Sequence, residues 1–232
     1  MRPIIVGACL TYCAACQPIP EIPADRSEVA VVAPAPATAE TYAIDPDDTE
    51  IRILVYRAGP LANLGHNHVI GARATSGRIA LSPELEDSSF ELRIPVLGLA
   101  VDDPAARAAA GDDFASVPNA TDIAGTRDNM LAPGLLDAQQ HPFIDVTGRF
   151  VQAAPTPQVA LSIRIKNHVA ERIVPVSLTL ADGRLAADAD FEMTHEQLGL
   201  SPFSVMMGAL RVAEAIRFQI RLVAYRPPDA QS

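Results

Sequence analysis

The chain lacks tryptophan altogether, and aromatic residues make up only 5% of its 232 residues. Hydrophobic residues nevertheless account for 49% of the sequence, so its interior must be built mainly from aliphatic side chains. Lysine is nearly absent as well, because Lys166 is the single lysine among 18 basic residues. A mechanism that forms a Schiff base would therefore have Lys166 as its one side-chain candidate.

Positive charge is also scarce, since 28 acidic residues against 18 basic ones give a formal net charge of −10. An acidic chain repels phosphate backbones, so nucleic acid is not expected as a partner. After the N-terminal segment no run approaches the ~20 apolar residues of a helical membrane span. The GxSxG elbow, the Walker loop and the dinucleotide fingerprint are missing too, and the chain is not expected to be an enzyme.

Cysteine is confined to the N-terminal segment, where Cys9, Cys13 and Cys16 are the only three in the chain. A basic residue, an apolar run at 4–10 and two alanines before Cys16 are typical of a short secretory signal. They also resemble a bacterial lipobox, and we expect lipidation at Cys16. Lipidation at Cys9 and plain secretion are the alternatives. The chain is therefore expected in the periplasm or cell envelope, held to a membrane by a lipid anchor.

Composition divides the remaining chain into three expected parts. Residues 17–41 carry five prolines among alanine and valine, which favours an extended tether. Residues 42–226 are expected to form one all-β domain, and residues 227–232 a short tail. Residues 1–16 are the expected signal peptide.

Alternation of apolar and polar residues, the period of a half-buried strand, recurs along the expected domain. It predicts strands over residues 51–56, 69–74, 78–81, 90–96, 142–152, 159–166, 174–180, 185–191 and 216–222. Residues 42–46 are expected to form a turn before the first strand. Short alternating strands at this spacing favour an antiparallel barrel or a sandwich.

Two helices are predicted to interrupt the strands, over residues 104–110 and 122–131. The first has a capping carboxylate and a proline in Asp102-Asp103-Pro104, and it should end at Gly111. Paired acidic residues elsewhere, at 47–48 and 112–113, are expected to be solvated or to cap helices, like Asp102 and Asp103.

The run Gly65-His66-Asn67-His68 concentrates two of the five histidines after a predicted strand. On extended backbone both imidazoles project from one face. Three interpretations remain open: the rings tie a tight turn together, they line the polar end of a ligand site, or they ligate a metal. A metal would need a third ligand, either a carboxylate or one of His141, His168 and His195.

Three motifs stand at the start, middle and end of the expected domain: Tyr42-x-Ile44-Asp45-Pro46, His141-Pro142-x-Ile144 and Gly199-Leu200-Ser201-Pro202-Phe203-Ser204-Val205. Together they resemble the YceI family of lipocalin-like periplasmic proteins, over about residues 42–225. The turn at 65–68 resembles that of a subgroup. The resemblance implies an extended eight-stranded antiparallel barrel, with a short helical insertion, that holds an isoprenoid such as a polyprenyl or quinone-like lipid.

Two features of the sequence itself could line such a cavity: inward aliphatic residues on several strands and the methionine-rich segment 203–208, since methionine adapts to flexible ligands. The same residues could instead simply fill the barrel, because small barrels are often packed solid. The expected ligand-binding residues are Leu64, His66, His68, Phe90, Leu92, Ile94, Leu161, Ile163, Phe191, Phe203, Met206, Met207 and Phe218. The leading hypothesis is thus an envelope protein that binds or carries an isoprenoid or other long-chain lipid. The alternative is a metal-binding periplasmic protein or metal-dependent enzyme centred on His66 and His68.

Overall fold

A computed structural model describes residues 38–227, whose strands form one 13-stranded sheet. All of its strand pairs are antiparallel. The expected signal peptide, nearly all of the expected tether and the lipidation site at Cys16 lie outside the described residues.

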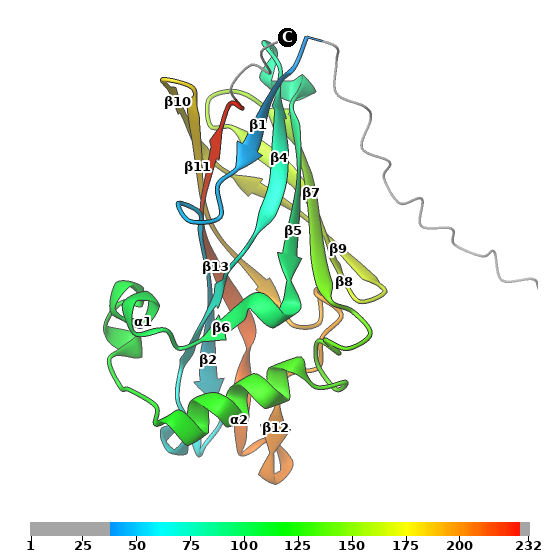
Figure 1. The fold of residues 1–232 in the computed structure, drawn as a ribbon. Helices are drawn as coiled ribbons and strands as arrows, with labels where there is room; N and C mark the ends of the chain where they lie inside the picture. The colour runs from blue at the N-terminus through cyan, green and yellow to red at the C-terminus, as the bar shows by residue number, and fades with distance from the viewer. Residues whose placement is uncertain (1–37, 228–232) are drawn as a thin grey trace, which may run out of the picture. The chain divides into compact units, whose positions relative to one another are not determined.

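The strands and helices follow one another along the chain as Figure 1 shows. The strands are β1 (Glu40–Ile44), β2 (Glu50–Ala58), β3 (His68–Ala72), β4 (Ser76–Leu81), β5 (Ser89–Pro95), β6 (Leu99–Val101), β7 (Phe143–Gln152), β8 (Gln158–Ile165), β9 (His168–Pro175), β10 (Ser177–Ala181), β11 (Arg184–Thr194), β12 (Ser204–Val205) and β13 (Leu210–Tyr225). The helices are α1 (Pro104–Ala110) and α2 (Ala120–Leu131), and 3-10 turns include η1 (Ala62–Leu64), η4 (Asp112–Phe114) and η5 (Met206–Gly208).

These strands group into eight longer spans, the number that the resemblance implies. Four spans are each divided in two by a short interruption: β1 with β2, β3 with β4, β5 with β6, and β9 with β10. The other four are β7, β8, β11 and β13, and the two-residue β12 pairs beside β13. The prediction of an all-β, antiparallel, lipocalin-like fold with a helical insertion is therefore confirmed.

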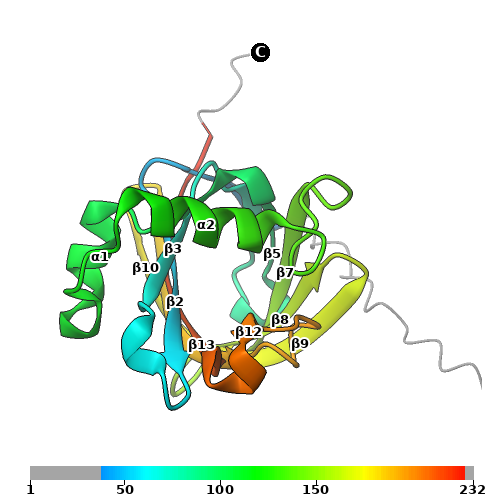
Figure 2. The ribbon, with the colours of Figure 1, turned by 90° about the horizontal axis from the view of Figure 1, so that it is seen from below.

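The strands curve into a barrel whose ladder of hydrogen bonds does not run in a closed ring (Figures 1 and 2). The paired order runs β6-β3-β2-β13-β1-β4-β5-β7-β8-β9, so β9 ends the path. The chain then passes directly from β9 to β10, which pairs with β11 beside β13. Helix α2 lies across the lower end of the barrel, next to β6 (Figure 1).

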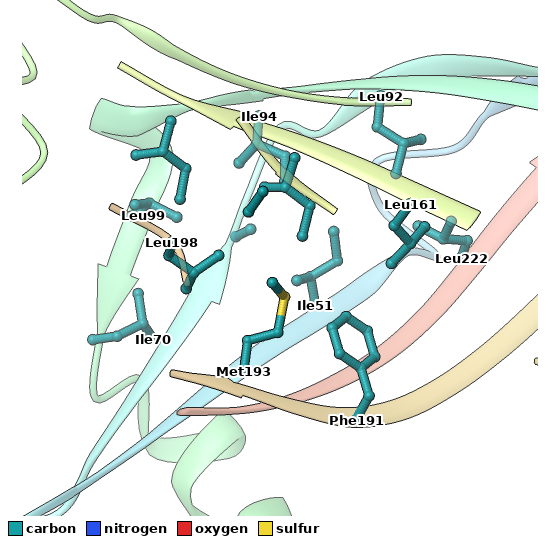
Figure 3. Packing of buried hydrophobic residues seen from close by; sticks show 14 of the residues in the cluster. Ile51, Ile70, Leu92, Ile94, Leu99, Leu161, Phe191, Met193, Leu198 and Leu222 are labelled. Carbon is teal, nitrogen blue, oxygen red and sulfur yellow. The ribbon is translucent and has the colours of Figure 1, made fainter. Parts of the chain in front are cut away.

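The core is aliphatic, as the lack of aromatic residues predicts. Ile51, Leu161 and Met193, from three different strands, turn toward one another inside the barrel (Figure 3). A separate small cluster packs Phe114 against Leu54 and Val69 on the outer side of β2 and β3. Burial at ~25 cal/mol per Å² of apolar surface makes the inner cluster the main source of stability.

Most predicted elements are confirmed, and the bounds of α1 match the prediction. Asp103 caps α1, because its Oδ1 accepts the N–H groups of Ala105 at 3.1 Å and Ala106 at 3.3 Å. No helix within residues 38–227 has the length and apolar character needed to cross a membrane.

Two predictions about strands were wrong. Residues 42–46 were expected to form a turn, but Tyr42 lies in β1 and is fully buried, since β1 pairs with both β4 and β13. The strand predicted over 174–180 is broken after Pro175. The N–H of Val176 still bonds to the carbonyl oxygen of Pro157 at 2.9 Å, in the register of β8 and β9, but Pro157 has no N–H to return the bond and the ladder ends there.

Candidate functional site

A cavity of about 370 Å³ lies inside the barrel, with walls contributed by strands on all its sides. The wall residues follow the period of two, so that Phe90, Leu92 and Ile94 face inward from β5. Facing them, Phe191 of β11 and Phe218 of β13 stack with ring centroids 5.1 Å apart. Branched aliphatic residues cover most of the remaining wall. Side chains therefore leave the barrel interior partly empty.

Ten of the thirteen ligand-binding residues expected from the sequence line this cavity. They are His66, His68, Phe90, Leu92, Ile94, Leu161, Ile163, Phe191, Phe203 and Phe218. Their contact with a ligand stays a prediction.

The other three, Leu64, Met206 and Met207, do not line the cavity. Their exposed fractions are 64%, 65% and 107%, so they face outward. They occupy turns η1 and η5, which project beyond the end of the barrel where β12 lies (Figure 1). The expectation that the methionine-rich segment lines the cavity is thus wrong for both methionines.

Most polar wall residues gather toward one end of the cavity, the end at which β2 finishes and β13 begins. They are Tyr56, Arg57, His66, His68, Thr126, Asn129, His195 and Arg211. Asp188 of β11 also belongs to the wall, and the opposite end, near Leu185 and Leu222, is otherwise lined by apolar side chains. We call the first the polar end of the cavity.

His68 is held at the polar end by the buried carboxylate of Asp102. Its Nδ1 lies 2.6 Å from Asp102 Oδ2, and the exposed side-chain fractions are 16% for His68 and 0% for Asp102. Burial, the largest influence, opposes ionisation of Asp102. The hydrogen bonds from His68 and from the N–H of Val69, with Arg107, outweigh it and lower the pKa of Asp102. Asp102 is therefore an ionised acceptor.

Arg107 of α1 supplies the charge that balances Asp102. Its Nη1 donates to Asp102 Oδ1 at 2.5 Å and to the carbonyl oxygen of Asn67 at 2.8 Å. Its Nη2 donates to the carbonyl oxygens of Phe114, at 2.8 Å, and Ser116. Arg107 thus ties the histidine turn to α1 and to the segment after η4.

Asn67 and His66 complete the turn. The Oδ1 of Asn67 accepts the N–H of Arg57 at 3.0 Å, and its Nδ2 donates to the carbonyl oxygen of Asp113 at 2.9 Å. Nε2 of His66 lies 3.5 Å from Asp122 Oδ2 of α2. Two of the three sequence interpretations, that the histidines tie the turn together and that they line the polar end of a ligand site, are compatible with this geometry.

The role of Asp102 was not predicted, because its pair with Asp103 suggested a solvated or capping group. Only Asp103 caps. The φ of Asp102 is +55°, and this left-handed backbone turns its side chain inward, toward His68, while Asp103 continues into the helix. His68 and Asp102 are separated by 34 positions in the sequence, so no local pattern reveals their contact. The one feature of the sequence that could have indicated this role was the position of Asp102, an aspartate where the backbone turns before a helix.

The remaining histidines lie apart from this turn. His195, expected at the surface, is only 5% exposed, lines the cavity and contacts the carbonyl oxygen of Glu214 through Nδ1 at 3.1 Å. Burial lowers the pKa of His195. Nε2 of His168 lies 2.9 Å from the carbonyl oxygen of Gln197.

Residues 38–227 contain no cluster of three or more histidine, cysteine or acidic side chains placed to hold a metal ion. His66 and His68, with ring centroids 6.4 Å apart, each contact a different carboxylate, Asp122 and Asp102. The two histidines therefore contact different carboxylates and share neither of them as a common metal ligand.

The polar end can orient a polar group. Because an ionised carboxylate only accepts hydrogen bonds, Nδ1 of His68 carries a proton, and Nε2 is the ring nitrogen that faces Thr126. Nε2 lies 3.4 Å from Thr126 Oγ1 of α2, which is longer than the hydrogen bond of an activated nucleophile. The arrangement suits recognition of a hydroxyl group better than acyl transfer.

Neither protein-family models nor curated protein sequences match the chain. Among solved structures, BcnA of Burkholderia cenocepacia is similar with a TM-score of 0.57 and 14% identity, over 78% of this chain and 99% of that one. A YceI protein of Campylobacter jejuni is similar with a TM-score of 0.50 and 9% identity, over 68% of this chain and 85% of that one. The chain has the fold of the YceI-like proteins, as its sequence motifs predicted.

Proposed function

We propose that the barrel binds one long apolar lipid, of the isoprenoid class, and holds its polar end beside His68. The observation that carries this proposal is the cavity of about 370 Å³ with an aliphatic and aromatic wall. Its volume falls in the range of about 300–1,000 Å³ typical of small-molecule sites.

The wall suits a branched hydrocarbon chain. Each buried CH₂ contributes ~0.8 kcal/mol, so a long chain needs no charged anchor to bind tightly. Since noncovalent affinities saturate near ~20 kcal/mol, much of that gain must be offset by ordering the chain. Selectivity should then depend on the length of the cavity and on the few groups at its polar end.

The polar end favours an alcohol. Nε2 of His68 is held in place by the contact of Nδ1 with Asp102, and the Thr126 hydroxyl lies beside it. A ligand hydroxyl can donate to Nε2 and accept from Thr126. With a hydrocarbon that has no polar group, His68 Nε2 and the Thr126 hydroxyl keep only their long contact with each other, at 3.4 Å.

Native mass spectrometry of the purified full chain tests the proposal. We expect a bound mass that organic solvent extracts, or uptake of added geranylgeraniol in a one-to-one complex. In the variant Ala189→Phe the new ring enters the cavity and should abolish uptake, because Ala189 belongs to the wall. The matched control is Ile173→Phe, since Ile173 is 59% exposed on β9. Uptake by Ala189→Phe equal to that of the control would refute binding in the cavity.

The cellular setting is part of the proposal. Lipidation at Cys16 would fix the protein to the periplasmic face of a membrane, because an anchor of two or more acyl chains holds stably. The chain should then fractionate with membranes, and Cys16→Ser should release it. A wild-type protein that is fully soluble with a free N-terminus would contradict lipidation.

Measurements on purified proteins also distinguish the metal-binding alternative from lipid binding. A metal bound by His66 and His68 should appear one-to-one in elemental analysis and vanish in both His66→Ala and His68→Ala. If the pair instead serves the cavity, His68→Ala should lower the affinity for geranylgeraniol, and metal content should not change.

A further inference from the structure

Two connections project beyond the polar end of the barrel and carry large exposed apolar side chains. One joins β2 to β3 and includes η1, and the other joins β12 to β13 and includes η5. On these connections the exposed fractions are 64% for Leu64, 65% for Met206 and 107% for Met207, and Phe203, directly before β12, is 48% exposed. We call these four residues, with Arg57 and Arg211, the tip surface.

The two connections are bonded together. The N–H of Leu61 donates to the carbonyl oxygen of Ala209 at 2.8 Å. Gly59, at φ +96°, approaches so closely that a Cβ there would lie 2.4 Å from the same oxygen. In the view of Figure 2 this end of the barrel faces the reader, with β12 near β2 and β13. The tip surface is therefore one surface rather than two loose loops.

The two exposed methionines adopt a backbone conformation that is unfavourable for residues other than glycine and asparagine. Met206 and Met207 have φ values of +51° and +54°, in the left-handed region where glycine and asparagine are favoured. Strained backbone of this kind concentrates at functional positions. Here it places two flexible apolar side chains in solvent, where they contribute nothing to the core.

The two connections themselves contain no acidic residue. The molecule carries 28 acidic residues, yet none occurs within residues 51–83 or 197–213, the stretches that contain the two connections. Arg57 and Arg211 are both exposed there. They brace the connections, since Arg57 Nη1 donates to the carbonyl oxygen of Gly65 at 2.6 Å and Arg211 Nη1 to that of Gly208 at 3.2 Å.

The tip surface is continuous with the cavity. Phe203, Arg57 and Arg211 belong both to the tip surface and to the cavity wall. Because Phe203 is 48% exposed as well, the cavity reaches the outside beside it. An apolar ligand entering at this end would pass the exposed methionines.

From these observations we infer that the tip surface docks the barrel onto an anionic lipid bilayer. The four apolar side chains enter the interface between head groups and acyl chains, and the two arginines meet the lipid phosphates. The polar end of the cavity then faces the bilayer, so a lipid can pass between membrane and barrel without crossing water. Docking stands on the tip surface alone, whereas the passage of lipid rests on the proposed function.

Vesicle co-sedimentation of the full chain tests docking. All three cysteines are replaced by serine, so that no acyl anchor contributes. Vesicles of equal parts phosphatidylglycerol and phosphatidylcholine are compared with vesicles of phosphatidylcholine alone. The test variant is Met206→Asn with Met207→Asn, because asparagine tolerates the left-handed backbone. The matched control is Ile173→Ser with Leu180→Ser, which removes two side chains exposed by 59% and 50% elsewhere on the barrel.

We expect the test variant to bind anionic vesicles about tenfold more weakly than the parent, and the control to bind like the parent. Arg211→Gln should weaken binding about threefold to fivefold on anionic vesicles only. Equal binding by parent and test variant would overturn the inference. So would a parent that dimerises through this surface, seen as a dimer in sedimentation velocity that the test variant dissociates, because the occupant is then a second copy.

Uptake of geranylgeraniol from detergent separates the two proposals. The test variant should take it up like the parent but receive it more slowly from vesicles. If no protein takes up the alcohol while docking still depends on the methionines, the proposed function fails and the docking surface stands. If all take it up and none docks, only the docking inference fails.

Discussion

Replacing Arg107 with methionine should be among the most damaging single changes to this fold. Methionine keeps much of the length of the arginine stem but cannot donate hydrogen bonds. It leaves the Asp102 carboxylate, with an exposed side-chain fraction of 0%, without its permanent counter-charge. It also leaves the carbonyl oxygens of Asn67, Phe114 and Ser116 without the guanidinium donor.

The expected loss follows from the burial of the pair. Removing one partner of a buried ion pair costs about 3–5 kcal/mol, because the remaining charge is uncompensated. We therefore expect the free energy of unfolding of Arg107→Met to fall by about that amount at pH 8, a large share of the ~5–15 kcal/mol of a typical domain.

A second substitution should recover part of this loss. Adding Asp102→Asn removes the orphaned charge and should recover part of the stability, since asparagine tolerates the φ of +55°.

Urea unfolding followed by far-ultraviolet circular dichroism measures these differences. The control is Arg93→Met, because the partner pair Arg93 and Asp145 is exposed at 58% and 37% and should contribute little. A loss in Arg107→Met no larger than in this control would refute the reasoning. No recovery on adding Asp102→Asn would show that the orphaned carboxylate is not the cause of the loss.

Three further predictions test separate features. The pKa of His195 is lowered by burial, so the unfolded chain binds a proton on this histidine more readily than the folded protein does. The stability of the wild type should therefore be retained above pH ~6.5 and decrease as the pH falls. His195→Phe should remove this dependence and give a flatter curve of melting temperature against pH. Gly59→Ala should lower the free energy of unfolding in urea by about 1–3 kcal/mol, because the new Cβ would collide with the carbonyl oxygen of Ala209. Gly183→Ala should cost less, since a Cβ at that position meets nothing within 4 Å. Equal losses in the two variants would refute the close approach at Gly59. Thr126→Val should leave stability nearly unchanged but reduce, in competitive uptake, the preference for geranylgeraniol over the parent hydrocarbon; an unchanged preference would exclude Thr126 from recognition of the hydroxyl.

Much of the fold could be predicted because its strands obey a simple rule. In β8, Val159, Leu161 and Ile163 are all buried while their neighbours are not, and this alternation is visible in the sequence. The cap at Asp103 was also local, since its carboxylate and the amides it accepts lie within three residues. Features that depend only on residues close together in the sequence, such as these two, were predicted correctly.

What could not be predicted depends on contacts between distant segments. Met206 and Met207 have the composition of cavity residues, but a turn of left-handed backbone points them outward, and composition carries no direction. Asp102 and His195 look like surface residues, and their burial follows from the pairing of β6 with β3 and from contact with β13. The sheet order, in which β13 pairs with β1, β2, β11 and β12, likewise follows from no local pattern.

The way α2 is attached has a consequence for the local opening of the molecule. Side-chain bonds tie it to the barrel, from Thr126 to His68 and from Arg127 Nη2 to the carbonyl oxygen of Leu97 at 3.1 Å. β13, in contrast, shares backbone hydrogen bonds with strands on both sides. Detaching α2 breaks no ladder, so amide protons of α2 should exchange with deuterium at a lower opening free energy than those of β13. The helix next to His68 is thus expected to open before the barrel does.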